Sequence, residues 1–208
     1  MTENAVIWYR KCMEHGAVLQ TVNDLYIDLS LPENKYYSGI RKSYKSLIHE
    51  GSRLWKVRLL KDGLSEEDFE VFRLFHIQVA GRITRSEETW ELQRQAMASS
   101  NMFIVAIYDE SDTMVGYGMF SITRDEGVYA IGVYDRTLFD KPLGHLIQWE
   151  AIRYMRQLGL RWYKIGKRFY TGDTLAPTDK EVSIAYYKEG FATNLFVNLI
   201  STNDISKT

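Results

Sequence analysis

The fold is decided by residues 102–158, which read MFIVAIYDESDTMVGYGMFSITRDEGVYAIGVYDRTLFDKPLGHLIQWEAIRYMRQL. Strands are predicted at Met102–Tyr108, Met114–Thr123 and Val128–Tyr134, because each run is apolar and rich in β-branched and aromatic residues. The connectors between these strands are short and polar, which is typical of hairpins. Pro142 suits the first turn of a helix that continues to the end of the stretch. The stretch therefore predicts an antiparallel meander followed directly by a long helix.

The segments on either side complete a mixed sheet. A strand predicted at Trp162–Ile165 follows the long helix as in a βαβ crossover, which favours a parallel pair and helices on both faces of the sheet. Further helices are predicted at Ala5–Glu14, Glu33–Glu50, 65–81, 86–98 and Lys180–Lys188, and further strands at Leu25–Leu29, 55–60 and Leu195–Ile200. We expect the α/β (α+β) class, with a mixed, largely antiparallel sheet.

Composition indicates a folded chain. Of its 208 residues, 45% are apolar and 13% aromatic, which is enough apolar surface to offset the entropy of ordering. The length predicts a single domain, with an N-terminal helix and strand in residues 1–60, a core in residues 61–200 and a frayed tail in residues 201–208. No apolar run approaches the ~20 residues of a membrane helix, so we expect no membrane span.

Charge and cysteine content narrow the partners and the compartment. The formal net charge is −1, and no segment has the basic footprint of a dedicated nucleic-acid binder. Lys164, Lys167 and Arg168 could meet phosphates, although a solvated face is the simpler interpretation. The single Cys12 cannot form an internal disulfide, and the first residues do not resemble an export signal. We therefore expect a cytoplasmic protein, and the oligomeric state stays open.

The connector between the third meander strand and the long helix is a candidate anion site. Free N–H groups at a helix start attract anions, and Arg136 and Lys141 add positive charge nearby. Gly144 is the one glycine in this connector that could let backbone approach a pyrophosphate. An ordinary strand–helix connector explains the same residues equally well.

His145 and Trp149 share one side of the long helix through their i, i+4 spacing. Histidine titrates near neutral pH, so His145 could accept a proton or hold an anion. A packed, hydrogen-bonded histidine beside a tryptophan is the simpler interpretation.

Residues 75–93 read FHIQVAGRITRSEETWELQ and are dense in hydrogen-bonding side chains. Arg82 and Arg85 fall in a predicted helix–helix turn, where two guanidinium groups could form a fork for a carboxylate or a phosphate. Pairing of both arginines with surface acids is the alternative.

Residues 177–191 read PTDKEVSIAYYKEGF and predict a capped helix. Lys180 and Lys188 share one helix face, and Glu181 lies one step round from it. A lysine facing a cleft would bind a phosphate or a developing oxyanion, and a carboxylate could take a proton. Solvated charges on a short helix are the alternative.

Together these segments resemble FemAB-type proteins, which are GNAT-related aminoacyltransferases. The resemblance covers about residues 25–192. It is carried, in the expected order, by Leu29–Glu33 with Ile40–Ile48, by residues 75–93, by DRTLFDKPLGHLIQWEAI at Asp135–Ile152, and by residues 177–191. The resemblance implies a GNAT-like domain, one of the two halves of a FemAB protein. Where the family has two glycines after its GF pair, this chain has Ala192 and Thr193.

The resemblance further implies an N-acyltransferase without a metal. Acyl-CoA or aminoacyl-tRNA would donate the group to an amine of a sugar-nucleotide or cell-envelope precursor, by direct attack of that amine. Lys188 would neutralise donor phosphate or developing charge, and Glu181 or His145 would accept the proton. The other implied roles are donor binding by Arg136, Lys141 and Gly144, and acceptor binding by His76, Arg82, Arg85, Trp90, Gln93, Trp149 and Lys180. We expect these side chains to converge on one pocket beside Pro142.

Two other functions stay open. The missing glycines favour a non-catalytic GNAT-like binding module that recognises a nucleotide-sugar or a partner protein. The tyrosines and tryptophans near basic residues favour a single-stranded nucleic-acid binder.

Overall fold

The computed structural model describes residues 3–61, 64–173 and 176–202. The strands are β1 (Val18–Asp28), β2 (Lys56–Leu60), β3 (Met102–Tyr108), β4 (Met114–Ile122), β5 (Glu126–Tyr134), β6 (Trp162–Arg168) and β7 (Asn194–Thr202). The helices are α1 (Glu3–Glu14), α2 (Glu33–Gly39), α3 (Lys42–Leu54), α4 (Glu66–Ala80), α5 (Glu87–Ala98), the short η1 (Arg136–Leu138), α6 (Leu143–Gln157) and α7 (Asp179–Glu189).

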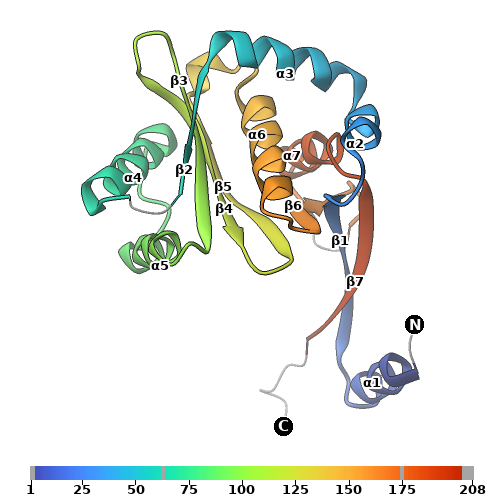
Figure 1. Cartoon of the computed structure of the whole chain (residues 1–208). Helices are drawn as coiled ribbons and strands as arrows, with labels where there is room; N and C mark the ends of the chain where they lie inside the picture. The colour runs from blue at the N-terminus through green and yellow to red at the C-terminus, as the bar shows by residue number, and fades with distance from the viewer. Residues whose placement is uncertain (1–2, 62–63, 174–175, 203–208) are drawn as a thin grey trace.

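The strands form one mixed sheet in the order β2-β3-β4-β5-β6-β1-β7. Only β5 and β6 pair in parallel, and α6 makes the crossover between them. Helices lie on both faces of the sheet (Figure 1). The predicted fold class, meander and parallel pair are therefore confirmed.

An apolar core lies on each face of the sheet. Neighbouring residues along a strand point to opposite faces. On β4, Phe120 packs into the core under α6 and α3, which also contains Ile147 of α6. The adjacent Met119 packs into the core under α4 and α5, with Phe72 and Trp90. α4 and α5 therefore lie on one face of the sheet, and α3 and α6 lie on the other (Figure 1).

Gly118 of β4 lies where α6 approaches the sheet closely. A Cβ atom there would lie 2.8 Å from Cγ2 of Ile147 and 2.9 Å from the Phe120 ring. We expect Gly118→Ala to lower the free energy of unfolding by about 1–3 kcal/mol, because the core would have to shift to accept a methyl group. Gly39→Ala is the control, since no atom lies within 4 Å of its Cβ position. Urea unfolding of both variants checks this, and equal stabilities would contradict it.

The helix predicted over Glu33–Glu50 is wrong in its continuity. The chain forms α2 and α3 with a break at Ile40 and Arg41, both of which have extended ψ angles. Arg41 donates its backbone N–H to the Gly190 carbonyl, a contact that the helical periodicity does not reveal. Gly51, predicted as the helix end, lies inside α3, where its Cβ position is 3.0 Å from the Pro142 carbonyl oxygen.

Four strands, β1, β5, β6 and β7, are longer than predicted. β1 begins at Val18 instead of Leu25, and β6 continues to Arg168. Of the tail expected to fray, residues 201–202 belong to β7, and residues 203–208 lie outside the described residues. The strand predicted over 55–60 forms as β2, but most of its side chains are exposed because β2 is an edge strand.

Candidate functional site

The sheet forks between β5 and β6. The two strands pair only from Glu126 to Val128 on β5 and from Trp162 to Lys164 on β6. Beyond this point β6 carries a β-bulge, because its pairing with β1 moves from Lys164 to Gly166 across one step of β1. In α/β sheets, ligands bind at the carboxyl ends of strands where neighbours separate. The fork is therefore the natural place for a site.

A pocket of about 380 Å³ occupies this fork beneath α7. Its volume is in the range of small-molecule sites. Its walls come from Val128 and Tyr129 of β5, from Lys164, Gly166, Lys167 and Phe169 of β6 and its end, and from Glu181, Ile184, Ala185 and Lys188 of α7. Three lysines against one glutamate make the pocket basic, which suits an anionic ligand.

Lys188 is the most distinctive group in the pocket. Burial lowers the pKa of the Lys188 ammonium. Its Nζ lies 5.3 Å from the centroid of the Tyr129 ring, and no carboxylate in the described part of the chain forms an ion pair with it. Gly166 makes room for it, since a Cβ there would lie 2.5 Å from Nζ. A lysine held without a counter-ion beside a pocket is suited to a negative charge that arrives with a ligand or develops during a reaction.

Lys164 is held in place by a buried carboxylate. Asp24 accepts hydrogen bonds from Nζ of Lys164 at 2.7 Å and from Nδ2 of Asn198 at 2.8 Å. Burial, the largest single effect, lowers the pKa of Lys164, but the hydrogen bond and charge of Asp24 together with the nearby Tyr26 and Glu126 outweigh it, so the pKa is raised overall. Lys164 therefore stays charged, and Lys167 is exposed at the mouth of the pocket.

Glu181 lines the pocket but also caps its own helix. Its carboxylate accepts hydrogen bonds from the backbone N–H and the hydroxyl of Thr178, both at 2.8 Å. This capping box lowers the pKa of Glu181, so the carboxylate is ionised at neutral pH and is a weak proton acceptor. Lys180 is exposed in the first turn of the same helix and does not line the pocket.

His145 is packed among aromatic rings instead of lining the pocket. Its ring centroid lies 4.5 Å from that of Tyr44 and 5.1 Å from that of Tyr187. Nε2 is buried without a hydrogen-bond partner in the described structure. Burial, assisted by the charge of Arg41, lowers the pKa of His145 to about 4. The ring is therefore neutral at physiological pH and poorly placed to take a proton from a ligand in the fork.

The pKa of His145 predicts a pH-dependent stability. Unfolded histidine titrates near ~6.5, so between about pH 4 and 6.5 the unfolded chain binds more protons, and the free energy of unfolding rises with pH. Lowering the pH through this window should cost wild type about 1–3 kcal/mol more than it costs His145→Phe, which keeps the aromatic packing. Urea unfolding across this pH window checks the difference. Identical pH profiles for the two proteins would rule out His145 as the titrating group.

Buried tyrosines fill the base of the fork behind the pocket. The hydroxyls of Tyr129 and Tyr134 are 2.6 Å apart, and burial raises the pKa of Tyr129 to about 12. Tyr187 buries a hydroxyl without a partner in the described structure, and a Cβ on Gly144 would lie 2.8 Å from it. Gly144 thus makes room for a tyrosine, which gives this glycine a packing role beside the donor-binding role that the resemblance implies.

At the start of α6, the N–H group of Leu143 donates to the Lys141 carbonyl at 3.0 Å. Pro142 is the N-cap residue and provides no side-chain hydrogen bond. Arg136 is exposed in η1, and Lys141 is exposed beside Asp140 at 3.3 Å. These cations lie along the connector as predicted, but neither lines the pocket at the fork.

The remaining candidates lie elsewhere. Trp149 stacks on Tyr36 with 6.0 Å between ring centroids, in a groove between α2 and α6. The ring of His76 lies 5.3 Å from that of the buried Trp90. Arg82 and Arg85 lie in the α4–α5 turn, where Arg82 is exposed, and Gln93 on α5 buries an Oε1 atom that has no partner in the described structure. Of all the predicted site residues, only Glu181 and Lys188 line the pocket.

Several pocket residues are absent from the sequence-based site. Lys164 and Lys167 stand out only as local charges, because the pairing that draws Lys164 to Asp24 joins positions 140 residues apart. No sequence pattern marks Tyr129 or Gly166 as a pocket residue, because the position of the fork depends on where β5 and β6 stop pairing.

No helix within residues 3–61, 64–173 and 176–202 has both the length and the apolar character needed to cross a bilayer. Within the same residues, no three His, Cys, Asp or Glu side chains are grouped so that they could hold a metal ion.

The chain is similar to several solved structures. No family model matches it, and no curated protein matches it significantly. L-PGS from Bacillus licheniformis superposes with a TM-score of 0.66 at 10% identity, covering 99% of this chain and 67% of that chain. FemX gives 0.65 at 9% identity, with 85% and 59% covered. The C-terminal domain of a protein described as a lysylphosphatidylglycerol synthetase, from Agrobacterium fabrum, gives 0.64 at 12% identity, with 97% and 66% covered.

These similarities show the fold. The chain has the fold of FemX and of the two other similar structures, as the FemAB-type resemblance of its sequence implies. It spans between 59% and 67% of the lengths of the three structures. At identities of 9–12%, the similarity concerns the fold and not the activity.

Proposed function

We propose that this protein is an N-acyltransferase. In this proposal an acyl or aminoacyl group passes from acyl-CoA or an aminoacyl-tRNA to an amine of a sugar-nucleotide or cell-envelope precursor. The observation that carries the proposal is Lys188, which lies partly buried at the fork of β5 and β6 and forms no ion pair with any described residue. The acyltransferase fold of the similar structures supports it.

The proposed reaction is a direct substitution at the donor carbonyl. The amine nitrogen attacks the carbonyl carbon, an amide bond forms, and the ester or thioester bond breaks. The leaving oxygen or sulfur takes one proton, and the amine loses one, so protons balance. In the tetrahedral intermediate the carbonyl oxygen carries a negative charge, and the Lys188 ammonium stabilises it in a setting where burial strengthens the interaction.

Glu181 and the other lysines position the substrates. The ionised Glu181 attracts the ammonium form of the acceptor. Solvent first takes one proton from this ammonium to give the free amine that attacks, and the second proton is lost as the amide forms and goes to the leaving group. Lys164 and Lys167 attract phosphate groups, which both donor classes and sugar-nucleotides carry. We assign the uncapped start of α6, with Arg136 and Lys141, to the donor phosphates, since free helix N–H groups favour anions.

Donor consumption tests the proposal. The protein is incubated with acetyl-CoA or with aminoacyl-tRNA, together with a panel of amino-sugar nucleotides, and mass spectrometry detects the amide product. We expect one donor class to be consumed only when an acceptor amine is present. No turnover with any pair would overturn the proposal.

A specific observation favours the binding module as second candidate. The turn after α7 is tied to β1, because Thr193 receives a hydrogen bond from the Asp28 N–H at 2.7 Å and donates its own N–H to the Tyr26 carbonyl at 2.9 Å. Thr193, at one of the family's two glycine positions, thus has a structural role, and its N–H is not free to bond a ligand. Ligand-induced thermal stabilisation without turnover would support this candidate.

A further inference from the structure

Part of the β1–β7 pair stands outside the sheet. β6 pairs with β1 only from Asn23 to Asp28, whereas β7 pairs with β1 from Val18 to Tyr26. The segment from Val18 to Val22 therefore has only β7 beside it and forms a two-stranded ribbon. α1 continues from the end of this ribbon, away from the other helices (Figure 1).

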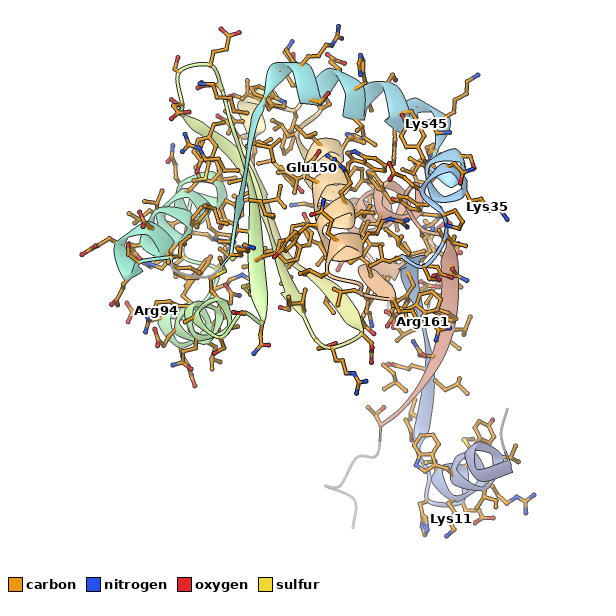
Figure 2. All side chains as sticks on the ribbon, in the orientation of Figure 1. Lys11, Lys35, Lys45, Arg94, Glu150 and Arg161 are labelled. Atoms are coloured by element: carbon orange, nitrogen blue, oxygen red, sulfur yellow. The ribbon has the colours of Figure 1, made fainter. Side chains whose placement is uncertain are left out.

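The ribbon and α1 expose many large apolar side chains. None of the described side chains of α1 is buried, and Figure 2 shows Lys11 on this helix far from the body of the molecule. The exposed apolar residues are Val6, Ile7, Trp8, Tyr9, Met13, Val18, Leu195, Phe196, Val197, Leu199 and Ile200. A helix of twelve residues and a two-stranded ribbon are each marginal in water on their own. These elements therefore require a covering partner.

The outer edge of β7 lacks the features that usually prevent an edge strand from pairing with another strand. β7 is the last strand of the sheet, so its outer backbone groups have no strand partner among residues 3–61, 64–173 and 176–202. Its sequence, NLFVNLIST, contains no charged residue and no proline, although such residues usually keep edge strands from pairing. Such an edge is a template for another strand.

The sequence of β7 is complementary to itself. Antiparallel pairing of two β7 strands about Asn198 would place Val197 opposite Leu199 of the partner subunit, on one face. On the other face it would place Phe196 opposite Ile200 of the partner subunit. The same two-fold arrangement brings α1 of each copy beside the Leu195 end of the partner's β7, because α1 adjoins the end of the ribbon at Thr202.

We propose that two copies of this chain associate through the β7 edge, with α1 covering the partner's ribbon. The exposed apolar side chains of one copy offer on the order of 1,000 Å², compared with about 800 Å² per partner in a standard stable interface. The contact is isologous, so it closes after two copies.

Sedimentation of the full chain tests the dimer. We expect twice the mass of 24.3 kDa at micromolar concentration. One variant carries Val197→Lys with Leu199→Lys, and a second carries Val197→Glu with Leu199→Glu. Each alone should be monomeric, because pairing about Asn198 sets like charges against each other, and a mixture of the two should recover the dimer. Recovery on mixing distinguishes lost contact from lost folding.

Two single substitutions test the proposed dimer interface further. Val71→Lys, on an exposed part of α4, should leave the dimer intact. Trp8→Ala should raise the dimer dissociation constant about tenfold, since buried tryptophans dominate interfaces. A monomeric wild type, or dimers that persist in both charge variants, would overturn the proposal, and an unchanged constant for Trp8→Ala would remove α1 from the interface.

Discussion

Replacing Lys188 with alanine is expected to lower kcat for acyl transfer by about 10²–10³-fold. Lys188 is the one cation of the pocket that burial holds without a carboxylate partner in the described structure, so its charge is available to the intermediate. KM should change less than kcat, because the charge that Lys188 stabilises develops during the reaction. Steady-state kinetics on the pair of substrates found by the donor screen gives both constants.

Two further variants separate chemistry from folding. Lys188→Met keeps an unbranched, apolar stem in the buried position and should lose as much activity as Lys188→Ala with little loss of stability. Lys35→Ala removes a lysine that points away from the body of the molecule and should leave the rate unchanged (Figure 2). If Lys188→Met were as active as wild type, the lysine would have no catalytic role.

The pH dependence gives an independent readout for Lys188. Because burial lowers the pKa of Lys188, the ammonium is lost at a lower pH than for an exposed lysine. The rate of wild type should therefore fall as pH rises through that lowered pKa. The residual rate of Lys188→Met should lack this decline.

The sheet was predictable where the chain pairs with its own neighbours. The β3-β4-β5 meander follows from short polar connectors, and the crossover through α6 follows from Pro142 and the apolar stripe behind it. The first half of β1 was not predictable. Residues 18–24 include polar side chains without clean alternation, and their strand conformation depends on β7, which lies more than 170 residues later in the chain.

The sequence predicted two residues of the pocket but not where the pocket lies in the fold. A resemblance and a helix face were enough to select Lys188 and Glu181, which share the pocket. The expected convergence of Arg82 and His145 with Lys188 on one pocket is wrong, because it depends on tertiary packing. Arg82 lies in the turn between α4 and α5, which pack into a different core from α6, and His145 packs among aromatic rings. Whether those residues contribute to the function stays a prediction.

We expect Gly166→Ala, at the fork between β5 and β6, to lower both stability and kcat. Gly166 has a φ of +147°, a backbone conformation that residues other than glycine rarely adopt. A Cβ atom at this position would lie 2.5 Å from Nζ of Lys188. The alanine variant should lose about 1–2 kcal/mol of stability to strain. It should also lose at least about tenfold in kcat, because the lysine would be displaced from its position. Gly172→Ala, with open space at its Cβ position, is the control.

A double-mutant cycle distinguishes displacement of Lys188 from general damage. If Gly166→Ala acts by moving Lys188, the substitution has nothing left to move in the Lys188→Ala background. It should then reduce kcat less than about twofold there. Kinetics of the four proteins, with thermal melts to correct for any unfolded fraction, give the coupling. If the two losses of kcat are additive, Gly166 acts on the fork independently of Lys188. If they are strongly coupled, the absence of a side chain at Gly166 of β6 is what positions the Lys188 ammonium of α7.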